Sequence, residues 1–305
     1  MGYMLKGVYH AEDFKPKSNA RGEFQREASA IRDTADGPLE AGRYHLYLAV
    51  NCPWAHRTWL MTVLKGAADQ ITMSFAKPKR TDQGWVFDAD GCFTDPLYGY
   101  DALHQLYATH DNYTGRITVP VLVDKSDGRL INNESAEILR ILNDGLAGPD
   151  YYPEALREQI DAWNDRIYPN LNNGVYRAGF SRTQEAYDAA VMQVFEMLDE
   201  LEAHLTDNQY LVGDVMTEAD IRLFPTLARF DHGYHSGFKC NKRRIVDYPN
   251  IWAYARAIYQ MDGVAETVDF DIYRRGYNSQ SELRNPLGII PIGPDMDWNT
   301  PHGRG

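Results

Sequence analysis

The feature that most constrains the fold is a strand-like segment followed at once by Asn51-Cys52-Pro53-Trp54-Ala55-His56-Arg57. Residues 44–50 form a short, continuous apolar run of the kind that predicts a buried strand. Pro53 suits the first turn of a helix, because the N–H that proline lacks has no partner there. We therefore predict a strand that turns directly into a helix over residues 53–65, with Cys52 at the helix N-terminus.

The elements after this turn predict a thioredoxin-like domain. We expect a strand at residues 71–76, a helix at 103–110, a hairpin of strands at 119–123 and 129–131, and a helix that carries Ile138 and Leu142. The order strand, helix, strand, helix, strand, strand, helix matches that domain. A loop over residues 78–99 carries Trp85 and Cys92, and loops of this length are usually functional.

Beyond Gly148-Pro149 the pattern changes to helices alone. An apolar stripe over residues 184–205 predicts an amphipathic helix, Thr217 and Asp220 form a capping box, and a further helix follows Pro249. The predicted fold class is α/β plus all-α, a thioredoxin-like N-terminal domain with an all-helical C-terminal domain. The predicted domains are an irregular N-terminal arm at 1–40, the thioredoxin-like domain at 41–148, and the helical domain with a C-terminal extension at 149–305. Residues 292–305 carry no signal that we can interpret.

Composition and charge exclude several classes of function. The chain is 44% hydrophobic and 24% charged, as folded globular proteins are, and 305 residues are long for a single core. Its net charge of −12 opposes binding to nucleic acid or to an anionic membrane. The uncharged run at 44–55 is too short to span a bilayer, and residues 1–14 lack the apolar core of a signal peptide. We expect a cytoplasmic protein that binds neither nucleic acid nor membrane.

The three cysteines of the chain lie too far apart in sequence to suggest a disulfide framework. Cys52 is the candidate nucleophile, because the N–H groups and the dipole at a helix N-terminus favour a thiolate. His56 and Arg57 can favour it further. The alternative is a buried structural thiol. Cys92 and Cys240 are expected to be non-catalytic.

Position 55 indicates which chemistry such a thiol performs. A dithiol oxidoreductase has a second cysteine three residues after the first, and here Ala55 occupies that position. A monothiol site must borrow its second thiol, and glutathione is the abundant cytosolic one. We predict glutathione as a co-substrate, with no nicotinamide cofactor.

Two other groups of residues carry weaker signals. His232, His235 and Cys240 match no zinc-ligand spacing, so no metal site is expected. The basic residues among positions 239–244 are expected to form a solvated or ion-paired face rather than a nucleic-acid site.

Five segments spread along the chain form a set. They are Gly22-Glu23-Phe24-Gln25-Arg26, the Cys-Pro-Trp-Ala-His-Arg run from Cys52, Asn172-Asn173-Gly174-Val175-Tyr176-Arg177-Ala178-Gly179-Phe180, Phe238-Lys239-Cys240-Asn241 with Arg243-Arg244, and Asn285-Pro286-Leu287-Gly288-Ile289-Ile290-Pro291. Together they resemble the glutathionyl-hydroquinone reductases, the Xi class of the glutathione transferases. The resemblance implies a helical glutathione-transferase domain after the thioredoxin-like one, a homodimer, and the reduction of glutathionyl-hydroquinones.

The start of the helix after residue 133 suits the charged γ-glutamyl end of glutathione. Ser135 and backbone N–H groups there can bind the carboxylate, and Glu134 can pair with the ammonium. Capping of the helix by these residues is the alternative. Val119 precedes Pro120, which thioredoxin folds hold cis so that the preceding backbone can pair with the tripeptide.

The remaining site residues are implied by the resemblance alone. It implies glutathione contacts by Trp85 and Arg116, and it places Tyr176 and Tyr277 in the hydroquinone pocket. A phenol there can assist as the carbon–sulfur bond breaks. Tyr168 is a weaker candidate, since the chain has 20 tyrosines and ordinary packing accounts for most of them.

The residues around Cys52 predict an enzyme, and the resemblance implies that it is a glutathionyl-hydroquinone reductase. It is expected to work through a Cys52–glutathione disulfide and to yield hydroquinone and oxidised glutathione. Two alternatives stay open. One is a transferase resembling the omega class, which reduces dehydroascorbate or removes glutathione from proteins. The other is a non-catalytic module that binds aromatic ligands while Cys52 is idle.

Overall fold

The computed structural model describes residues 2–11, 17–35 and 37–304, which form two compact units. The thioredoxin-like unit comprises residues 27–149 and the described residues before position 12. The helical unit comprises residues 17–26 and 150–304. Residues 1, 12–16 and 36 of the predicted arm, and residue 305 of the predicted helical domain, lie outside the described residues.

The main sheet of the thioredoxin-like unit has the strand order β4-β3-β6-β7. Its strands are β3 (Tyr44–Ala49), β4 (Thr72–Ala76), β6 (Val121–Asp124) and β7 (Arg129–Asn132). β3 runs parallel to β4 and antiparallel to β6, and β6 forms a hairpin with β7. Every residue of β3 is buried, as its continuous apolar run predicts for a central strand.

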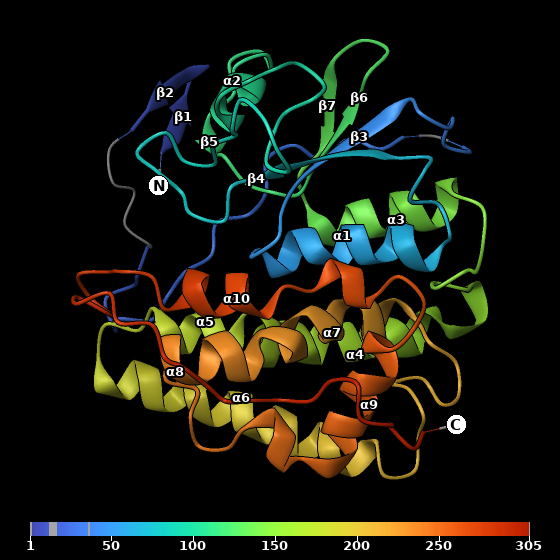
Figure 1. The fold of residues 1–305 in the computed structure, drawn as a ribbon, viewed down its shortest axis with the longest axis vertical. Coiled ribbons are helices and arrows are strands. Elements are labelled where there is room, and N and C mark those ends of the chain that lie inside the picture. Colours follow the sequence, from blue (N-terminus) through green and yellow to red (C-terminus); the bar gives the residue numbers. More distant parts are fainter. Residues whose placement is uncertain (1, 12–16, 36, 305) are drawn as a thin grey trace. The chain divides into compact units, whose positions relative to one another are not determined.

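Helices α1 (Pro53–Leu64) and α3 (Ser135–Gly145) pack against each other on one face of this sheet (Figure 1). Helix α2 (Leu103–Tyr107) is shorter than the predicted helix over 103–110. The order of these strands and helices is the predicted one and confirms the thioredoxin-like fold.

Residues 3–10 form a hairpin, so the prediction of an irregular arm is wrong for them. Strands β1 (Tyr3–Leu5) and β2 (Val8–His10) make a small antiparallel sheet with β5 (Gly115–Arg116). The turn between β1 and β2 uses Lys6 and Gly7, both with positive φ, which is the geometry of tight hairpins. Strands of three residues are too short for an alternating pattern to stand out in the sequence.

The long loop that follows β4 is fastened to the main sheet by one buried carboxylate. Asp95 accepts hydrogen bonds from the hydroxyls of Tyr47 on β3 (3.0 Å) and Ser74 on β4 (3.2 Å). It also accepts two backbone N–H groups of its own loop. The loop that carries Trp85 is therefore anchored in the core of the unit.

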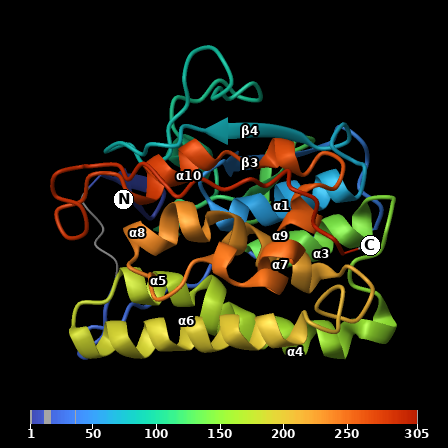
Figure 2. The same ribbon diagram turned by 60° about the horizontal axis from the view of Figure 1, so that its bottom comes forward.

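Helices make up the regular structure of the described part of the helical unit. They are α4 (Arg157–Ile167), α5 (Gly174–Gly179), α6 (Gln184–His204), α7 (Glu218–Arg229), α8 (His235–Gly237), α9 (Pro249–Tyr259) and α10 (Phe270–Tyr277), with short 3₁₀ turns η1 (Glu154–Leu156), η4 (Ile245–Asp247) and η5 (Ala265–Thr267). Two π-helical turns, η2 (Tyr168–Asn172) and η3 (Phe230–Tyr234), precede α5 and α8. The long helix α6, yellow in Figure 2, packs against α5 and α9. The all-helical prediction is confirmed.

The predicted capping box is present at the start of α7. The N–H and the hydroxyl of Thr217 both donate to Asp220 Oδ2, at 2.8 and 3.1 Å. Asp220 Oδ1 accepts the Leu211 N–H and the Tyr254 hydroxyl, so this buried carboxylate also ties α7 to α9. The residues that start this helix therefore contribute to the core as well.

The last described residues are docked on the helices, although their sequence carries no interpretable signal. Trp298 is 2% exposed, and its ring lies against the rings of Trp252, Tyr259 and Phe270. Arg304 donates to backbone carbonyls at and beyond the end of α6. These contacts fix the C-terminal segment to α6, α9 and α10.

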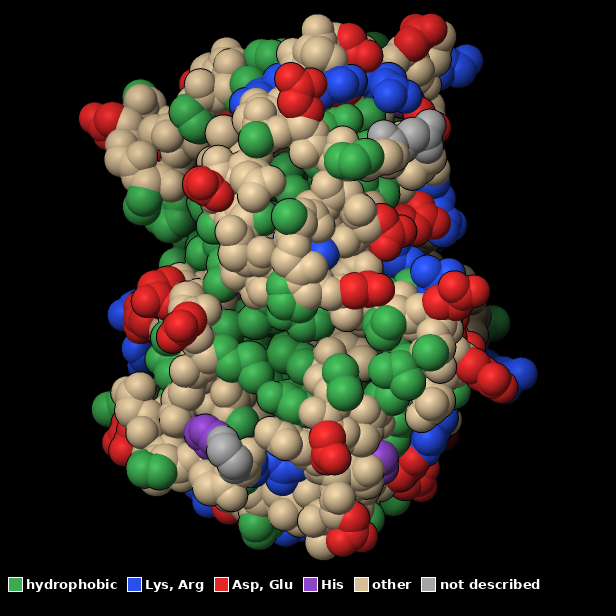
Figure 3. All heavy atoms as spheres, turned by 90° about the vertical axis from the view of Figure 1, so that its right-hand side faces the viewer, with side chains coloured by type: hydrophobic (Ala, Val, Ile, Leu, Met, Phe, Trp, Pro, Cys, Tyr) green, Lys and Arg blue, Asp and Glu red, His purple; other side chains and the backbone are tan. Residues whose placement is uncertain are grey.

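The surface carries charges of both signs. On the face in Figure 3, Lys and Arg side chains lie among Asp and Glu side chains. In the basic cluster at 239–244, Arg244 forms an ion pair with Asp247 at 2.8 Å, so the expectation of an ion-paired face is confirmed there. Within the described part of the chain, no helix is long and apolar enough to cross a membrane.

Candidate active site

Cys52 occupies the N-cap position of α1, directly after β3. Pro53 is the first residue of the helix, and the Cys52 carbonyl accepts the N–H of His56 at 3.0 Å. Cys52 is half-buried, and its Sγ lies 3.6 Å from the carbonyl oxygen of Val119. The predicted place of the thiol at a helix N-terminus is confirmed. The N–H groups and the dipole of that helix end favour a thiolate, whereas the Val119 carbonyl oxygen accepts from the protonated thiol.

A cis peptide bond joins Val119 to Pro120, as predicted. Val119 is buried, and its carbonyl oxygen is the group next to the Cys52 sulfur. The preceding residue, Thr118, is held by the Tyr107 hydroxyl, which donates to the Thr118 carbonyl at 2.8 Å. A well-supported segment of backbone therefore lies beside the thiol.

Arg57 connects the helix that carries the thiol to the start of α3. It is 2% exposed, and its Nη1 lies 3.5 Å from Ser135 Oγ. Its guanidinium lies over the Trp54 ring at 4.5 Å. Ser135 is buried as well. Because charges act strongly in a low-dielectric interior, this buried cation adds positive potential where α1 and α3 begin.

Glu134 caps α3. Its Oε1 accepts the Ala136 N–H at 3.3 Å, and its Oε2 accepts the Ser29 hydroxyl at 2.9 Å. The capping role considered as the alternative for this residue is therefore present. An ionised carboxylate offers about four acceptor positions, so these two hydrogen bonds are compatible with a third, to a ligand ammonium.

The other two predicted glutathione contacts lie on different elements. Trp85 lies in the long loop, is 7% exposed, and has the Arg80 guanidinium 5.0 Å above its ring. Arg116 is half-buried in β5, where Tyr3 of β1 pairs with it and the Tyr113 hydroxyl donates to its carbonyl at 2.8 Å. The N-terminal hairpin therefore supports the segment that carries Arg116.

Three tyrosine hydroxyls meet in the helical unit. Tyr176 comes from α5 and Tyr277 from α10, and their hydroxyl oxygens lie 2.9 Å apart. Tyr234, from η3, donates to the Tyr277 hydroxyl at 3.4 Å. We call Tyr176, Tyr234 and Tyr277 the phenol cluster. It contains both tyrosines implied by the family resemblance and a third that the sequence reasoning missed, whereas Tyr168 is exposed on η2.

Aromatic rings and guanidinium groups surround the phenol cluster. The ring of Phe238 lies 5.1 to 5.4 Å from those of the three tyrosines. The Arg26 guanidinium lies over the Tyr176 ring at 4.8 Å, and that of Arg284 lies over Phe238 at 5.1 Å. Arg26, Tyr176 and Phe238 belong to three of the segments that carry the family resemblance, so segments far apart in sequence meet here.

Two glycines allow α10 to come close to this cluster. A Cβ atom at Gly233 would lie 2.7 Å from the Tyr277 ring, and one at Gly237 would lie 2.6 Å from the Tyr277 carbonyl oxygen. Any larger residue at either position would push α10 away. Tyr234 lies between these two glycines, which are four residues apart.

Burial keeps two hydroxyls of the phenol cluster, those of Tyr234 and Tyr277, protonated. It raises the pKa of the Tyr277 and Tyr234 hydroxyls well above their usual value of 10, while the positive charge of Arg229 acts in the opposite direction on both. Protonated hydroxyls in hydrogen-bonded contact are able to donate a proton to a substrate.

Models of known protein families match both units. Residues 51–144 match the glutathione S-transferase N-terminal domain, and residues 184–257 match the glutathione S-transferase C-terminal domain.

Relatives that align over the whole chain assign it to one class of the glutathione transferases. The chain is 48% identical to the glutathionyl-hydroquinone reductase YqjG of Escherichia coli K12, over 100% of this chain and 98% of the relative. It is 46% identical to the glutathionyl-hydroquinone reductase PcpF of Sphingobium chlorophenolicum, over 96% of each. The solved structure of an Xi-class glutathione transferase from Natrialba magadii superposes with a TM-score of 0.92 at 40% identity, over 100% of this chain and 97% of that one. The chain belongs to the Xi class of glutathione transferases.

Membership of the Xi class confirms the predicted family and the two predicted fold types. A glutathione-bound structure of YqjG superposes on this chain with a TM-score of 0.86 at 45% identity, over 99% of this chain and 98% of that one. The chain is therefore an enzyme of a glutathione-dependent family.

The other two cysteines of this Xi-class chain lie in environments unlike that of Cys52. Cys240 is fully buried, and burial raises the pKa of its thiol, which keeps the thiol neutral and unreactive. Cys92 is exposed on the long loop. Among the described residues, no group of His, Cys, Asp and Glu is arranged to hold a metal ion.

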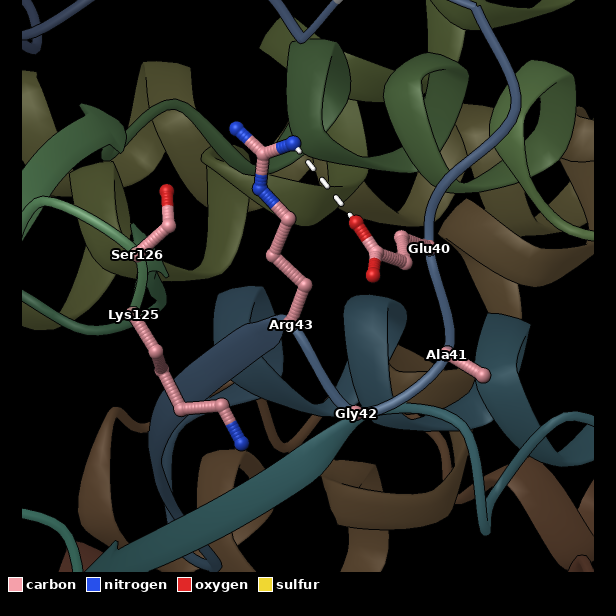
Figure 4. A pocket seen from close by; sticks show the side chains of 6 residues that line it. All are labelled: Glu40, Ala41, Gly42, Arg43, Lys125 and Ser126. Atoms are coloured by element: carbon pink, nitrogen blue, oxygen red, sulfur yellow. Dashed lines mark ion pairs between the residues drawn. The ribbon is translucent and has the colours of Figure 1, made fainter.

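A shallow pocket lies at the end of the main sheet opposite to Cys52. It is lined by Glu40, Ala41, Gly42, Arg43, Lys125 and Ser126 (Figure 4). These residues precede β3 or follow the antiparallel β6, whereas Cys52 follows β3. Arg43 is already paired with Glu40 at 3.9 Å and with Asp124 at 2.5 Å, so this pocket is not part of the candidate active site.

Proposed function

We propose that this chain reduces glutathionyl-hydroquinones to hydroquinones and releases oxidised glutathione. The observation that carries the proposal is a monothiol at a helix N-terminus, Cys52 with Ala55 three residues on, in a chain similar from end to end to two glutathionyl-hydroquinone reductases. The phenol cluster in the helical unit supplies the second chemical group that such a reaction needs.

The first step is a thiol transfer. The Cys52 thiolate attacks the sulfur that joins glutathione to the ring, and a Cys52–glutathione disulfide forms as the carbon–sulfur bond breaks. The electron pair of the broken bond passes to the ring carbon. That carbon takes a proton from Tyr176 or Tyr277, which becomes a phenolate, and the hydroquinone leaves.

The second step returns the enzyme to its starting state. A second glutathione attacks the Cys52–glutathione disulfide, releases oxidised glutathione and restores the Cys52 thiolate. The proton of its thiol restores the tyrosine hydroxyl. The sum is one glutathionyl-hydroquinone and one glutathione converted to one hydroquinone and one oxidised glutathione, so this scheme requires neither metal nor nicotinamide.

Five residues of the thioredoxin-like unit are proposed to hold glutathione. The backbone of Val119, next to the cis bond and to Cys52 Sγ, pairs with the tripeptide as an added strand does. Ser135 and backbone N–H groups at the start of α3 bind the γ-glutamyl carboxylate, and Glu134 binds its ammonium. Trp85 supplies a stacking surface, and Arg116 pairs with a carboxylate of the ligand.

A steady-state assay with glutathionyl-hydroquinone tests the proposal. Hydroquinone and oxidised glutathione are followed together, and equal amounts of both are expected from the scheme. Dehydroascorbate is offered in parallel, because a transferase of the omega kind would favour it. A protein that turns over dehydroascorbate and leaves glutathionyl-hydroquinone unchanged contradicts the proposal.

The assembly and location of the protein are part of the same proposal. A homodimer is the state that the family resemblance implies, and sedimentation equilibrium measures it directly. The reaction consumes reduced glutathione, which is abundant in the cytoplasm, and this supports a cytoplasmic location.

A further inference from the structure

Arg229, the last residue of α7, is a fully buried cation in the helical unit. Its Nη1 donates to the Pro225 carbonyl oxygen at 2.9 Å, and its guanidinium lies 3.8 Å from the centre of the Tyr273 ring. Burying a guanidinium is costly, and an apolar side chain of similar length would fill the same space without that cost. The cost of burying this guanidinium suggests that the positive charge of Arg229 has a function of its own.

The charge of Arg229 acts first on Tyr273, which it contacts, and also on the Tyr234 and Tyr277 hydroxyls of the phenol cluster. α7 continues directly into η3, which carries Tyr234, and α10, which carries Tyr273 and Tyr277, packs against both elements. The charge opposes the effect of burial on the hydroxyls of Tyr234 and Tyr277. Inside a protein such an interaction is several times stronger than in water.

Other charged or titratable side chains lie near the phenols, and they differ from Arg229 in how deeply they are buried or in the charge that they carry. Arg26 is half-buried and donates to Asn173 Oδ1 at 2.7 Å, and Arg284 is half-buried over neighbouring rings. Asp231 of η3 accepts two backbone N–H groups that start η4, and burial raises its pKa to about 6. His232 of η3 is neutral near pH 7, because burial lowers its pKa to about 4. Of the three arginines, Arg229 is the one that is completely buried.

We propose that Arg229 is a positioning residue of the reduction, whose buried charge stabilises the negative charge that forms on the phenol cluster when a tyrosine gives its proton to the substrate ring. The inference rests on the proposed function. In that step Tyr176 or Tyr277 becomes a phenolate while the ring carbon takes the proton and the electron pair of the carbon–sulfur bond. Hydrogen bonds among the three tyrosines spread the charge, and Arg229 balances it.

The test compares Arg229→Met, which removes the charge, with Arg229→Lys, which keeps it. Arg256→Met is the matched control, because Arg256 is 8% exposed and donates to the carbonyls of Thr300 and Pro301 at the end of the chain. Two reactions of each full-length variant are measured. One is the turnover of glutathionyl-hydroquinone, and the other is the exchange of glutathione with hydroxyethyl disulfide, which needs the thiol but no ring protonation.

We expect Arg229→Met to lower kcat for glutathionyl-hydroquinone about tenfold, because a nearby opposite charge shifts the acidity of a group by about one pKa unit or more. The rate of disulfide exchange stays at the wild-type level. The solvent deuterium isotope effect on kcat rises, since proton donation has become slower. Arg229→Lys restores most of the lost turnover, and Arg256→Met loses none.

Equal losses in both reactions contradict the proposal, as does a Lys variant as slow as the Met variant, because either result shows a packing role. If Arg229→Met does not fold, Arg229→Lys alone tests the proposal, and it must keep most of the wild-type turnover and the wild-type isotope effect. A wild-type protein that exchanges disulfides but leaves glutathionyl-hydroquinone intact overturns the proposed function and this inference with it. An active wild type with unaffected Arg229 variants overturns the inference alone.

Discussion

In the thioredoxin-like unit the thiol and its helix come from consecutive residues, whereas in the helical unit the three phenols come from three separate elements. Cys52 directly precedes Pro53, so its position at the N-terminus of α1 is set by a single strand-to-helix turn. Tyr176, Tyr234 and Tyr277 meet only because α5, η3 and α10 pack together.

This difference predicts how each group responds to substitution. The dipole and N–H groups that act on Cys52 belong to the backbone, so side-chain changes elsewhere have little effect on them. The phenol cluster depends on close approach, such as that of α10 to Gly233, and is therefore sensitive to distant changes in packing. Loss of the thiol should abolish all the proposed chemistry, and loss of a phenol only the part that involves the ring.

The largest effect is expected for Cys52→Ala. Removing the nucleophile should lower turnover of glutathionyl-hydroquinone more than about 10³-fold, since no other group forms the covalent intermediate. Mass spectrometry after exposure to oxidised glutathione should show one added glutathione on the wild type and none at position 52 of the variant. Cys92→Ala, which removes an exposed thiol, is the control and should keep full turnover. A Cys52→Ala protein that still turns over glutathionyl-hydroquinone contradicts the thiol-transfer mechanism.

A smaller and more selective effect is expected for the phenols. Tyr176→Phe and Tyr277→Phe should each lower kcat for glutathionyl-hydroquinone about 10²-fold, the usual contribution of a proton donor, and leave exchange with hydroxyethyl disulfide unchanged. Tyr168→Phe, on the exposed η2, is the matched control. If the exchange reaction falls as far as ring reduction, the phenols act on the thiol and not on the ring.

The same contrast explains what could be predicted from the sequence. The position of Cys52 follows from local rules, a buried apolar strand followed by proline at the first helical position, and the structure agrees. The capping box of Thr217 and Asp220 is equally local. Tyr176 and Tyr277 carry no local signal of this kind, and they entered the predicted site only through the family resemblance.

Three features of the structure lay beyond both local rules and the resemblance. Tyr234 joins the phenol cluster, and Arg229 is placed near it, through packing around η3, a π-helical turn that the sequence pattern does not reveal. The hairpin at 3–10 is too short to show a pattern, and it supports the strand of Arg116. Contacts of this kind depend on where elements pack in space, which a one-dimensional pattern does not encode.

An effect on binding alone is expected for Glu134→Gln. The amide keeps the length of the side chain but loses the charge proposed to hold the glutathione ammonium, a charge-assisted hydrogen bond worth about 1.5–3 kcal/mol. The KM for glutathione should therefore rise about tenfold or more at a nearly constant kcat. Ser29→Ala removes the hydroxyl that donates to Glu134 and is the control for disturbance of the cap. An unchanged KM in the Gln variant leaves Glu134 with its capping role only.

The smallest effect on activity is expected for His45, whose role is confined to the stability of the thioredoxin-like unit. Its ring nitrogens lie 2.7 Å from Thr72 Oγ1 and 2.8 Å from Ser74 Oγ, so β3 and β4 share this buried side chain. Burial lowers its pKa from the usual 6.5 to about 4. A group with a lowered pKa stabilises the fold fully above pH 6.5, and this contribution is lost as the pH falls through about 4, because the unfolded chain binds the proton more readily.

The free energy of unfolding should therefore decrease less between pH 6.5 and pH 4 in His45→Gln than in the wild type. The difference is at most about 3 kcal/mol for a pKa shift of this size. The change in urea midpoint with pH is the measurement, because the slope is independent of any constant cost of the substitution. His10→Gln, at an exposed position of β2, is the control and should keep the wild-type slope. If both variants keep that slope, acid sensitivity does not arise at His45, and His232 in the helical unit, whose pKa burial also lowers to about 4, is the next residue to test.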